Sequence, residues 1–377
     1  MTSSEQNDKN LSVAMVIDTW DDARNGAVIS TQRFTNMLRE DGNTVFVITS
    51  GKEEAGKIAL KEFYAPIVKK VMQKMKFSFA WPNKKKITAI FPQLDLIHNH
   101  MPFWLSYKTI QWAKKANIPV ISTFHVQAEQ IAHNAGFRQA FVVKFVYKLF
   151  VRFIYNKSDL VICPSKFAED EIKRQGCTTP TVVISNGVTN QYKVLKDIPK
   201  KSDLFTILSV GRNAYEKRQD MILRAVARSK YKDQIHLQII GDGPRRPKLE
   251  ALSKKLQLKN IEFNSVSQNE VVQYYNQADL YIHAAAVEVE CMTATEAMAC
   301  GVPLLIADSD LSATKQFALN NDFLFKDEEE LVRKIEYYFE HQEALTDART
   351  AYLEKAKQYS IDISYQKLLA AYRSVLK

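Results

Sequence analysis

Cysteine and long apolar runs are both scarce in this sequence. Only four cysteines occur among the 377 residues, and none forms a CxxC pair. Neither a zinc knuckle nor a disulfide framework is therefore indicated, and a reducing, cytoplasmic compartment is expected. No apolar run reaches the roughly 18 residues that a membrane span requires. Residues 1–10 are polar, lack the apolar stretch of a signal peptide and are expected to form a short disordered lead.

Basic residues outnumber acidic residues in the first half of the chain only. Residues 1–195 hold 26 Lys+Arg and 16 Asp+Glu, and the remainder is balanced, so the first half carries the whole net charge of +10. An excess confined to one half favours an anionic partner there, with a mere solubility surface as the alternative. No nucleic-acid-binding module is recognisable, so nucleic acid is not the expected partner.

Two basic, aromatic segments carry much of this excess. Residues 61–86 hold eight lysines and one acid, and residues 138–157 hold five basic residues and no acid. In the second segment Lys144, Lys148 and Arg152 recur every four positions, which gives one stripe along an otherwise apolar helix. Such a helix suits an anionic bilayer and predicts a peripheral position on the inner face of the cell membrane. The alternative is a core helix whose lysines reach outward.

Short Val- and Ile-rich runs alternate with helical stretches along the chain. Ser12–Asp18 is one such run, and continuous apolar runs are typical of strands buried on both faces of a parallel sheet. The pattern pauses at a polar, Lys-rich stretch, Tyr192–Leu204, and then restarts. The sequence thus predicts the α/β class, with two Rossmann-like domains facing across a cleft. The predicted parts are 1–195, 196–360, and a helix over 361–377 that packs back toward the first domain.

Basic residues and glycines follow the predicted strands of the second half. Gly211-Arg212 comes directly after one strand, and Glu216-Lys217 follows a few residues later. An Arg fork and a Lys ammonium at a strand end suit a diphosphate, although a solvated basic loop is equally consistent. Gly241 and Gly243 follow the next strand, where glycine lets the backbone approach a ligand or simply forms a tight turn.

Two glutamates, Glu288 and Glu296, stand eight positions apart. On a helix they would point about 80° apart, so they do not form one carboxylate pair. Glu288 is expected in a loop and Glu296 in the helix that follows, where its carboxylate suits a ribose diol. The backbone N–H groups at the helix start would face a diphosphate, and they belong to Cys291, Met292 and Thr293. The alternative is an ordinary surface pair of glutamates.

At these residues the sequence resembles the retaining GT-B glycosyltransferases of family 4, and among bacterial members those that glucosylate diacylglycerol. The resemblance spans about residues 12–345. In the second half it is carried, in order, by Gly211-Arg212, Glu216-Lys217, Gly241-Asp242-Gly243-Pro244, Ala278-Asp279 and Glu288-x7-Glu296-Ala-Met-Ala-Cys-Gly-Val-Pro. In the first half it is looser and is carried by Asn25-Gly26, His98-Asn99-His100, Thr123-Phe124-His125 and Ser185-Asn186-Gly187.

The resemblance implies transfer of a hexose from a nucleotide-diphosphate sugar, with UDP-glucose expected, to a membrane lipid such as diacylglycerol. The transfer would retain configuration and need neither a metal nor another cofactor. Arg212 and Lys217 would bind the donor diphosphate and stabilise the leaving group. Glu296 would hold the ribose, and Glu288 would contact the transferred sugar.

The first half and the junction also receive roles from the resemblance. His125 would lie near the anomeric centre, and a plain core histidine is the alternative. The backbone at Gly26 would approach the phosphate, and Asn186-Gly187 would lie on the hinge side of the cleft. His98 and His100 have no third ligand nearby in sequence and no DxD triplet ends a strand, so no metal site is predicted.

One departure from the family pattern is Glu290-Cys291, at positions where members usually carry Phe-Gly. A carboxylate so near the sugar leaves the sugar and the donor open. Three other functions therefore remain as hypotheses. They are a cell-surface or capsular polysaccharide transferase with a non-lipid acceptor, a nucleotide-sugar 2-epimerase, and a non-catalytic partner of another transferase.

Overall fold

In the computed structural model the chain divides into two compact units. The first comprises Met1–Ile184 together with Tyr365–Lys377, and the second comprises Ser185–Ser364. The structure describes residues 10–21, 25–65, 69–74, 77–134, 139–196, 198–199 and 202–376. Residues 1–9 of the predicted lead and Arg138 of the second basic segment lie outside these ranges.

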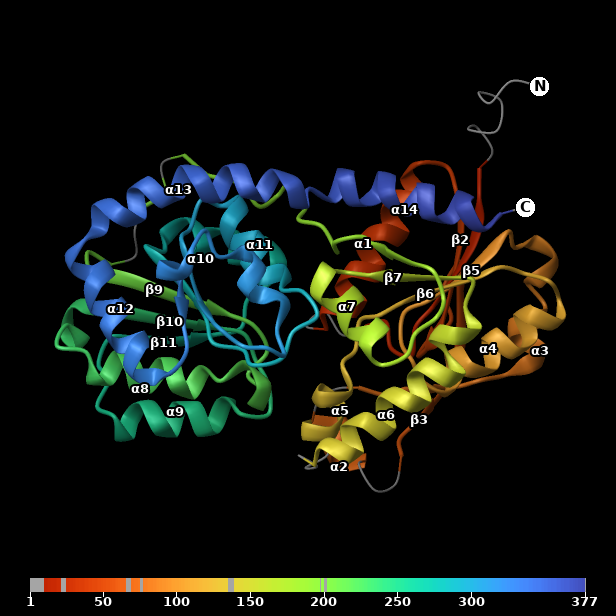
Figure 1. Cartoon of the computed structure of the whole chain (residues 1–377), viewed down its shortest axis with the longest axis horizontal. Coiled ribbons are helices and arrows are strands. Elements are labelled where there is room, and N and C mark those ends of the chain that lie inside the picture. Colours follow the sequence, from red (N-terminus) through yellow and green to blue (C-terminus); the bar gives the residue numbers. More distant parts are fainter. Residues whose placement is uncertain are drawn as a thin grey trace. The chain divides into compact units, whose positions relative to one another are not determined.

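The first unit is built on an eight-stranded sheet with the order β4-β3-β2-β1-β5-β6-β7-β8 (Figure 1). Neighbouring strands are parallel except β3 and β4, which are antiparallel. The strands are β1 (Ser12–Val16), β2 (Thr44–Ser50), β3 (Lys57–Phe63), β4 (Phe79–Trp81), β5 (Leu96–Asn99), β6 (Val120–Thr123), β7 (Leu160–Cys163) and β8 (Thr181–Val183). The helices between them are α1 (Gly26–Glu40), α2 (Lys69–Lys74), α3 (Lys84–Thr88), α4 (Trp104–Lys115), α5 (Ala128–Asn134), α6 (Ala140–Phe153) and α7 (Lys166–Arg174).

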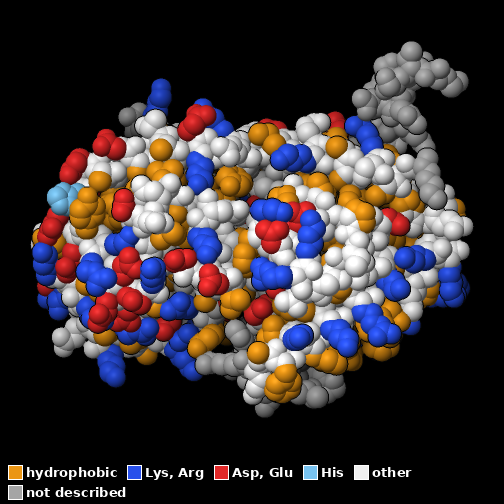
Figure 2. Space-filling view, viewed as in Figure 1, with side chains coloured by type: hydrophobic (Ala, Val, Ile, Leu, Met, Phe, Trp, Pro, Cys, Tyr) orange, Lys and Arg blue, Asp and Glu red, His pale blue; other side chains and the backbone are white. Residues whose placement is uncertain are grey.

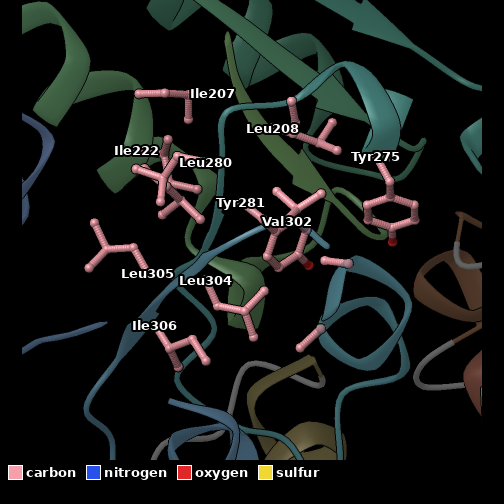
Figure 3. Packing of buried hydrophobic residues seen from close by; sticks show 14 of the residues in the cluster. Ile207, Leu208, Ile222, Tyr275, Leu280, Tyr281, Val302, Leu304, Leu305 and Ile306 are labelled. Carbon is pink, nitrogen blue, oxygen red and sulfur yellow. The ribbon is translucent and has the colours of Figure 1, made fainter. Parts of the chain in front are cut away.

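The second unit has a six-stranded parallel sheet with the order β11-β10-β9-β12-β13-β14. Its strands are β9 (Phe205–Val210), β10 (Ile235–Ile240), β11 (Ile261–Asn264), β12 (Leu280–His283), β13 (Leu304–Ala307) and β14 (Leu324–Phe325). Its helices are α8 (Gln219–Arg228), α9 (Arg246–Lys255), α10 (Gln268–Gln277), α11 (Met292–Ala299), α12 (Glu328–Glu340) and α13 (Gln342–Ala356). Figure 3 shows apolar side chains of β9, β12 and β13 packed together in its core.

The α/β class and the two tandem sheets predicted from the sequence are confirmed. The apolar runs of the sequence predict strands over Val120–Thr123, Leu160–Cys163, Phe205–Val210 and Ile235–Ile240. Strands β6, β7, β9 and β10 have these bounds, because such short runs are buried in the sheets. The sequence does not predict β3, β4 or β14. Of these, β3 carries charged residues among its apolar ones, and β14 has only two residues.

The units divide after Ile184, and not after residue 195 as predicted. The segment that follows Ile184 is bonded to the end of the second unit. The N–H of Val188 donates to the carbonyl of Tyr359 at 2.7 Å, and the N–H of Ile361 donates to the carbonyl of Val188 at 3.0 Å. Residues 185–195 therefore belong to the second unit.

Helix α14 (Ile361–Val375) is shared, because its residues from Tyr365 onward belong to the first unit. There the Tyr365 hydroxyl donates to Asp41 Oδ2 at 2.9 Å. The Tyr372 hydroxyl lies 2.8 Å from His98 Nδ1 and is fully buried. The last helix thus supplies part of the first unit's core.

Two glycines bring the loops after β9 and β10 into close contact. Gly241 has a φ of +137°, and a Cβ at this position would lie 2.1 Å from the carbonyl oxygen of Gly211. The N–H of Gly211 donates to the carbonyl of Ile240 at 2.9 Å. The packing of the protein itself therefore requires glycine at position 241, whatever ligand the loop meets.

Gly241→Ala is expected to lower the free energy of unfolding by about 3 kcal/mol or more, because backbone atoms have to move away from the new Cβ. Gly176→Ala is the matched control. Gly176 has a φ of +95° and nothing within 4 Å of the added Cβ. It should lose only the roughly 1–2 kcal/mol of a left-handed residue. Denaturant unfolding of both variants measures the difference, and equal losses would contradict the close contact.

Candidate active site

The loop after β9 forms the first part of the site. Arg212 donates from Nη2 to Glu216 Oε1 at 3.1 Å, and Glu216 is buried. The carbonyl of Glu216 accepts from the N–H of Ala286 at 2.9 Å, which ties this loop to the loop after β12. Glu216 therefore holds the Arg212 guanidinium at the carboxyl end of β9, where the guanidinium keeps partial exposure.

An ion pair joins Lys217, in the turn Tyr215–Lys217, to Glu288 in the loop after β12. Glu288 Oε1 also lies 3.4 Å from His283 Nε2. Burial by itself would raise the pKa of Glu288, but the Lys217 ammonium and His283 outweigh burial and lower the pKa to about 2. Glu288 is therefore an anion at neutral pH, although it is buried.

The loop of Glu288 is fixed by its backbone. The N–H of Glu288 donates to the carbonyl of Leu311 at 3.3 Å, and its carbonyl accepts from the N–H of Ala313 at 2.8 Å. Helix α11 starts shortly afterwards, at Met292. The prediction that Glu288 lies in a loop and Glu296 in the following helix is confirmed.

Glu296 lies in α11 and is buried. Its Oε2 accepts from the Tyr275 hydroxyl at 3.2 Å. The first N–H groups of a helix have no acceptor within the helix, so Met292 and Thr293 present theirs at the start of α11. These groups suit an anion, and the ribose role of Glu296 remains a prediction.

Cys291 and His283 meet beside the Lys217–Glu288 pair. Cys291 Sγ lies 3.5 Å from His283 Nε2 and 3.3 Å from Thr293 Oγ1. Burial disfavours the imidazolium of His283, but Cys291 and Glu288 outweigh burial and raise the pKa of His283 to about 9. His283 is not among the residues predicted from the sequence, because the only available signal was its place at the end of a strand.

The carboxylate of Glu290 is directed toward Asn186. Its Oε2 accepts from the backbone N–H of Asn186 at 2.9 Å and from the side-chain Nδ2 at 2.6 Å. Its Oε1 has no hydrogen-bond partner among the described residues. Burial raises the pKa of Glu290 to about 7, although hydrogen bonds from Ser185 and Asn186 act in the opposite direction. Glu290, one of the two residues that depart from the family pattern, therefore holds Asn186 in place near the start of the second unit.

The second unit brings together most of the predicted donor-binding residues, at the carboxyl ends of β9, β10 and β12. These are Gly211, Arg212, Lys217, Gly241, Gly243, Glu288, Cys291, Met292, Thr293 and Glu296. Gly26 and His125 belong to the first unit. Gly26 begins α1, whose N-cap Asn25 accepts from the N–H of Ala27 at 3.1 Å.

His125 lies in a buried histidine cluster of the first unit. His125 Nε2 is 3.3 Å from His100 Nδ1, and His98 Nε2 is 2.6 Å from Thr123 Oγ1. Burial lowers the pKa of His125 to about 4 and that of His98 to about 3. These imidazoles are therefore neutral at pH 7. The role of His125 near the anomeric centre stays a prediction.

Solved structures with this architecture cover nearly all of the chain. Anabaena HepE in complex with UDP-glucose superposes with a TM-score of 0.76 at 17% identity, over 97% of this chain and 100% of that one. WaaG, a glycosyltransferase involved in lipopolysaccharide biosynthesis, gives 0.68 at 17% identity, over 96% and 99%. At these identities the likeness concerns the fold, which is the GT-B architecture of glycosyltransferases.

Family models then identify the chain more narrowly. Residues 24–191 match the model described as Glycosyltransferase Family 4, and residues 191–358 match Glycosyl transferases group 1. The chain belongs to the family 4 glycosyltransferases and is a hexosyltransferase.

Curated relatives of this chain are named for different sugars. The alpha-monoglucosyldiacylglycerol synthase of Streptococcus pneumoniae is 26% identical over 316 residues, which cover 78% of this chain and 70% of the relative. The enzyme of the same name from Acholeplasma laidlawii is 26% identical, over 67% and 68%. The GDP-mannose-dependent alpha-mannosyltransferase of Mycolicibacterium smegmatis is 23% identical, over 79% and 80%.

Glu290→Gln is expected to change how stability depends on pH. A carboxyl whose folded pKa is raised from 4.5 to about 7 stabilises the protein fully below pH 4.5 and loses this contribution as pH rises through 7. The variant should therefore gain on the wild type between about pH 5 and about pH 8, by roughly 3 kcal/mol. Denaturant unfolding across this range measures the difference. The exposed Glu329→Gln is the control, and a pH-independent difference for Glu290→Gln would contradict the raised pKa.

Proposed function

We propose that this glycosyltransferase moves glucose from UDP-glucose to diacylglycerol at an anionic membrane surface. Support for the acceptor comes from the two relatives named alpha-monoglucosyldiacylglycerol synthase. The sugar follows from the same names, and UDP as its carrier from the resemblance found in the sequence. The observation that carries the proposal is the outward face of α6.

Helix α6 exposes large apolar side chains instead of burying them. Phe141 is 74% exposed and Phe145 is 59% exposed. The same helix exposes the predicted membrane-binding residues, Lys144, Lys148 and Arg152. Its inward face is formed by Tyr147, Phe150 and Val151. The exposed phenylalanines favour a surface helix over a core helix with outward lysines. The exposed face offers both cations and large apolar side chains, which are the two kinds of group that bind an anionic bilayer interface.

Helix α4 extends this surface. Trp104 is 48% exposed, and Lys108 Nζ lies 4.6 Å from its ring centroid. The Tyr107 ring packs against Phe153 of α6, with 5.6 Å between ring centroids. Figure 2 shows Lys and Arg side chains interspersed with hydrophobic ones over the region of α4 and α6. No described helix is long and apolar enough to cross a membrane. Contact with the bilayer would therefore rest on such a surface.

The positive charges of the second unit suit the cleavage of the bond between the sugar and the diphosphate. As the bond between C1 of glucose and the phosphate oxygen breaks, negative charge grows on the diphosphate. Arg212, Lys217 and the N-terminus of α11 would stabilise this charge without a metal. The acceptor hydroxyl would give its proton to the departing phosphate oxygen and bond to C1 on the same face. The configuration at C1 is then retained.

Arg212→Ala and Lys217→Ala are each expected to lower kcat about 100-fold, because both remove charge from the transition state. Affinity for free uridine should change little. Lys248→Ala, on the exposed part of α9, is the control and should keep its rate. Turnover is measured with UDP-glucose and with GDP-mannose, and circular dichroism checks the fold. Wild-type rates in both variants would place the diphosphate elsewhere.

Reversing the charges of α6 is expected to weaken binding to vesicles that contain anionic phospholipid. The triple variant Lys144→Glu, Lys148→Glu, Arg152→Glu loses three cations, each worth about 1 kcal/mol near such a surface. Salt should weaken wild-type binding in the same way, because screening lengths fall to about 3 Å at 1 M. Vesicle sedimentation measures both effects.

The control for this experiment changes the net charge equally in the second unit. Lys254, Lys255 and Lys259 are exposed, and their reversal should leave vesicle binding nearly intact. A separate variant, Phe141→Ser with Phe145→Ser, tests the apolar part and should lose the binding that survives high salt. Equal, weak binding of the wild type to neutral and anionic vesicles would count against the membrane role and favour a soluble acceptor.

A further inference from the structure

Three side chains of different chemistry converge beside the Lys217–Glu288 pair. His283 ends β12, Glu288 lies in the loop that follows, and Cys291 precedes α11. One ligating atom of each lies within 4.8 Å of the others, and all three residues are buried. Among the described residues this is the only group of three or more His, Cys, Asp and Glu with that spacing.

The spacing of these atoms fits a tetrahedral metal ion. Zinc binds nitrogen or oxygen at about 2.0–2.2 Å and sulfur at about 2.3 Å, so tetrahedral ligand atoms stand roughly 3.3–3.6 Å apart. Cys291 Sγ lies 3.5 Å from His283 Nε2, and His283 Nε2 lies 3.4 Å from Glu288 Oε1. The side chains need little movement to hold such an ion.

The ligand types narrow the choice of metal. A thiolate with an imidazole suits Zn²⁺, whereas Mg²⁺ and Ca²⁺ prefer sites built from oxygen alone. The thiol comes from Cys291, at a position where the family pattern usually has glycine. The site is therefore a property of this sequence more than of its family.

We propose that His283, Glu288 and Cys291 form an inhibitory Zn²⁺ site, with Nε2, Oε1 and Sγ as ligands and a water molecule as the fourth. As the Zn–S and Zn–N bonds form, the Cys291 thiol and the His283 imidazolium each release one proton to solvent. The water is the fourth ligand because Thr293 Oγ1, although near Cys291 Sγ, already accepts from the Tyr281 hydroxyl at 2.7 Å.

Inhibition is expected because the metal would bind Glu288 Oε1. Glu288 Oε1 is the atom that Lys217 contacts, so the ion and the ammonium compete for it. The Lys217 side chain is 20% exposed, which gives the ammonium a way out toward solvent. A bound ion therefore removes Glu288 from the sugar and displaces Lys217 from its place. Metal binding rests on geometry alone, whereas its effect on turnover rests on the proposed function.

The first experiment measures the site without any substrate. The full chain is stripped with a chelator and titrated with Co²⁺, whose absorption reports a thiolate ligand and a tetrahedral site. The wild type should show a thiolate-to-cobalt band that saturates at one ion per chain and is abolished by Zn²⁺. Cys291→Ser and His283→Gln should lose the band, and Cys300→Ser, another buried thiol, should keep it. No band in the wild type, or a band that survives Cys291→Ser, would overturn the site and leave a hydrogen-bonded cluster.

The second experiment measures transfer rates with and without Zn²⁺ within each variant. Zn²⁺ should slow the wild type at least tenfold, and EDTA should restore the rate. Cys291→Ser should need at least tenfold more Zn²⁺ for the same loss, while Cys300→Ser should behave as the wild type. If the cobalt band forms but Zn²⁺ leaves the rate unchanged, the inhibitory role is wrong and the metal site stands. A wild type inactive with every donor would refute the proposed function instead, and the cobalt result would still decide the site.

Discussion

A buried ion pair between Lys217 and Glu288 holds the second unit's site together. A buried carboxylate is costly unless a partner compensates its charge, and loss of the partner costs about 3–5 kcal/mol. Here the pair also links the loop after β9 to the loop after β12, which carries Glu288 toward α11. The pair therefore acts together with the backbone bonds of Glu288 to Leu311 and Ala313, which fix the segment that leads to α11. A ligand phosphate and Glu288 would both attract the Lys217 ammonium. Binding of the phosphate is therefore coupled to the stability of the two loops that the pair joins.

Local patterns in the sequence were sufficient to predict which secondary-structure elements carry the residues of the site. Glu296 was placed in a helix and Glu288 in a loop because eight positions do not return to the same helical face. The hydrogen-bond partner of Glu290 could not be predicted from the sequence, because Asn186 stands 104 positions earlier. The same holds for His98 and Tyr372, which are 274 positions apart. Such pairs are set by the order of strands in the sheets, which no periodicity encodes.

The two units use their charges differently. In the second unit, cations of α8 are matched by acids of α12, since Arg224 and Arg228 both donate to Glu328. On α6, Lys144, Lys148 and Arg152 have no carboxylate partner among the described residues. Paired charges keep a surface neutral and fix helices to each other, whereas unpaired ones leave an attractive field for anions. The net charge of +10 therefore belongs to residues 1–195 and not to the whole molecule.

Helix α14 has a consequence for the order in which the protein is made. Domains generally fold as they leave the ribosome, the N-terminal one first. Here Tyr372, fully buried against His98, stands 274 positions after it in the sequence. The first unit begins to be synthesised before the second, yet its histidine core stays incomplete until Tyr372 has been made. The second unit needs nothing beyond Ser364 and has all of its residues earlier. The part made first is thus the part finished last.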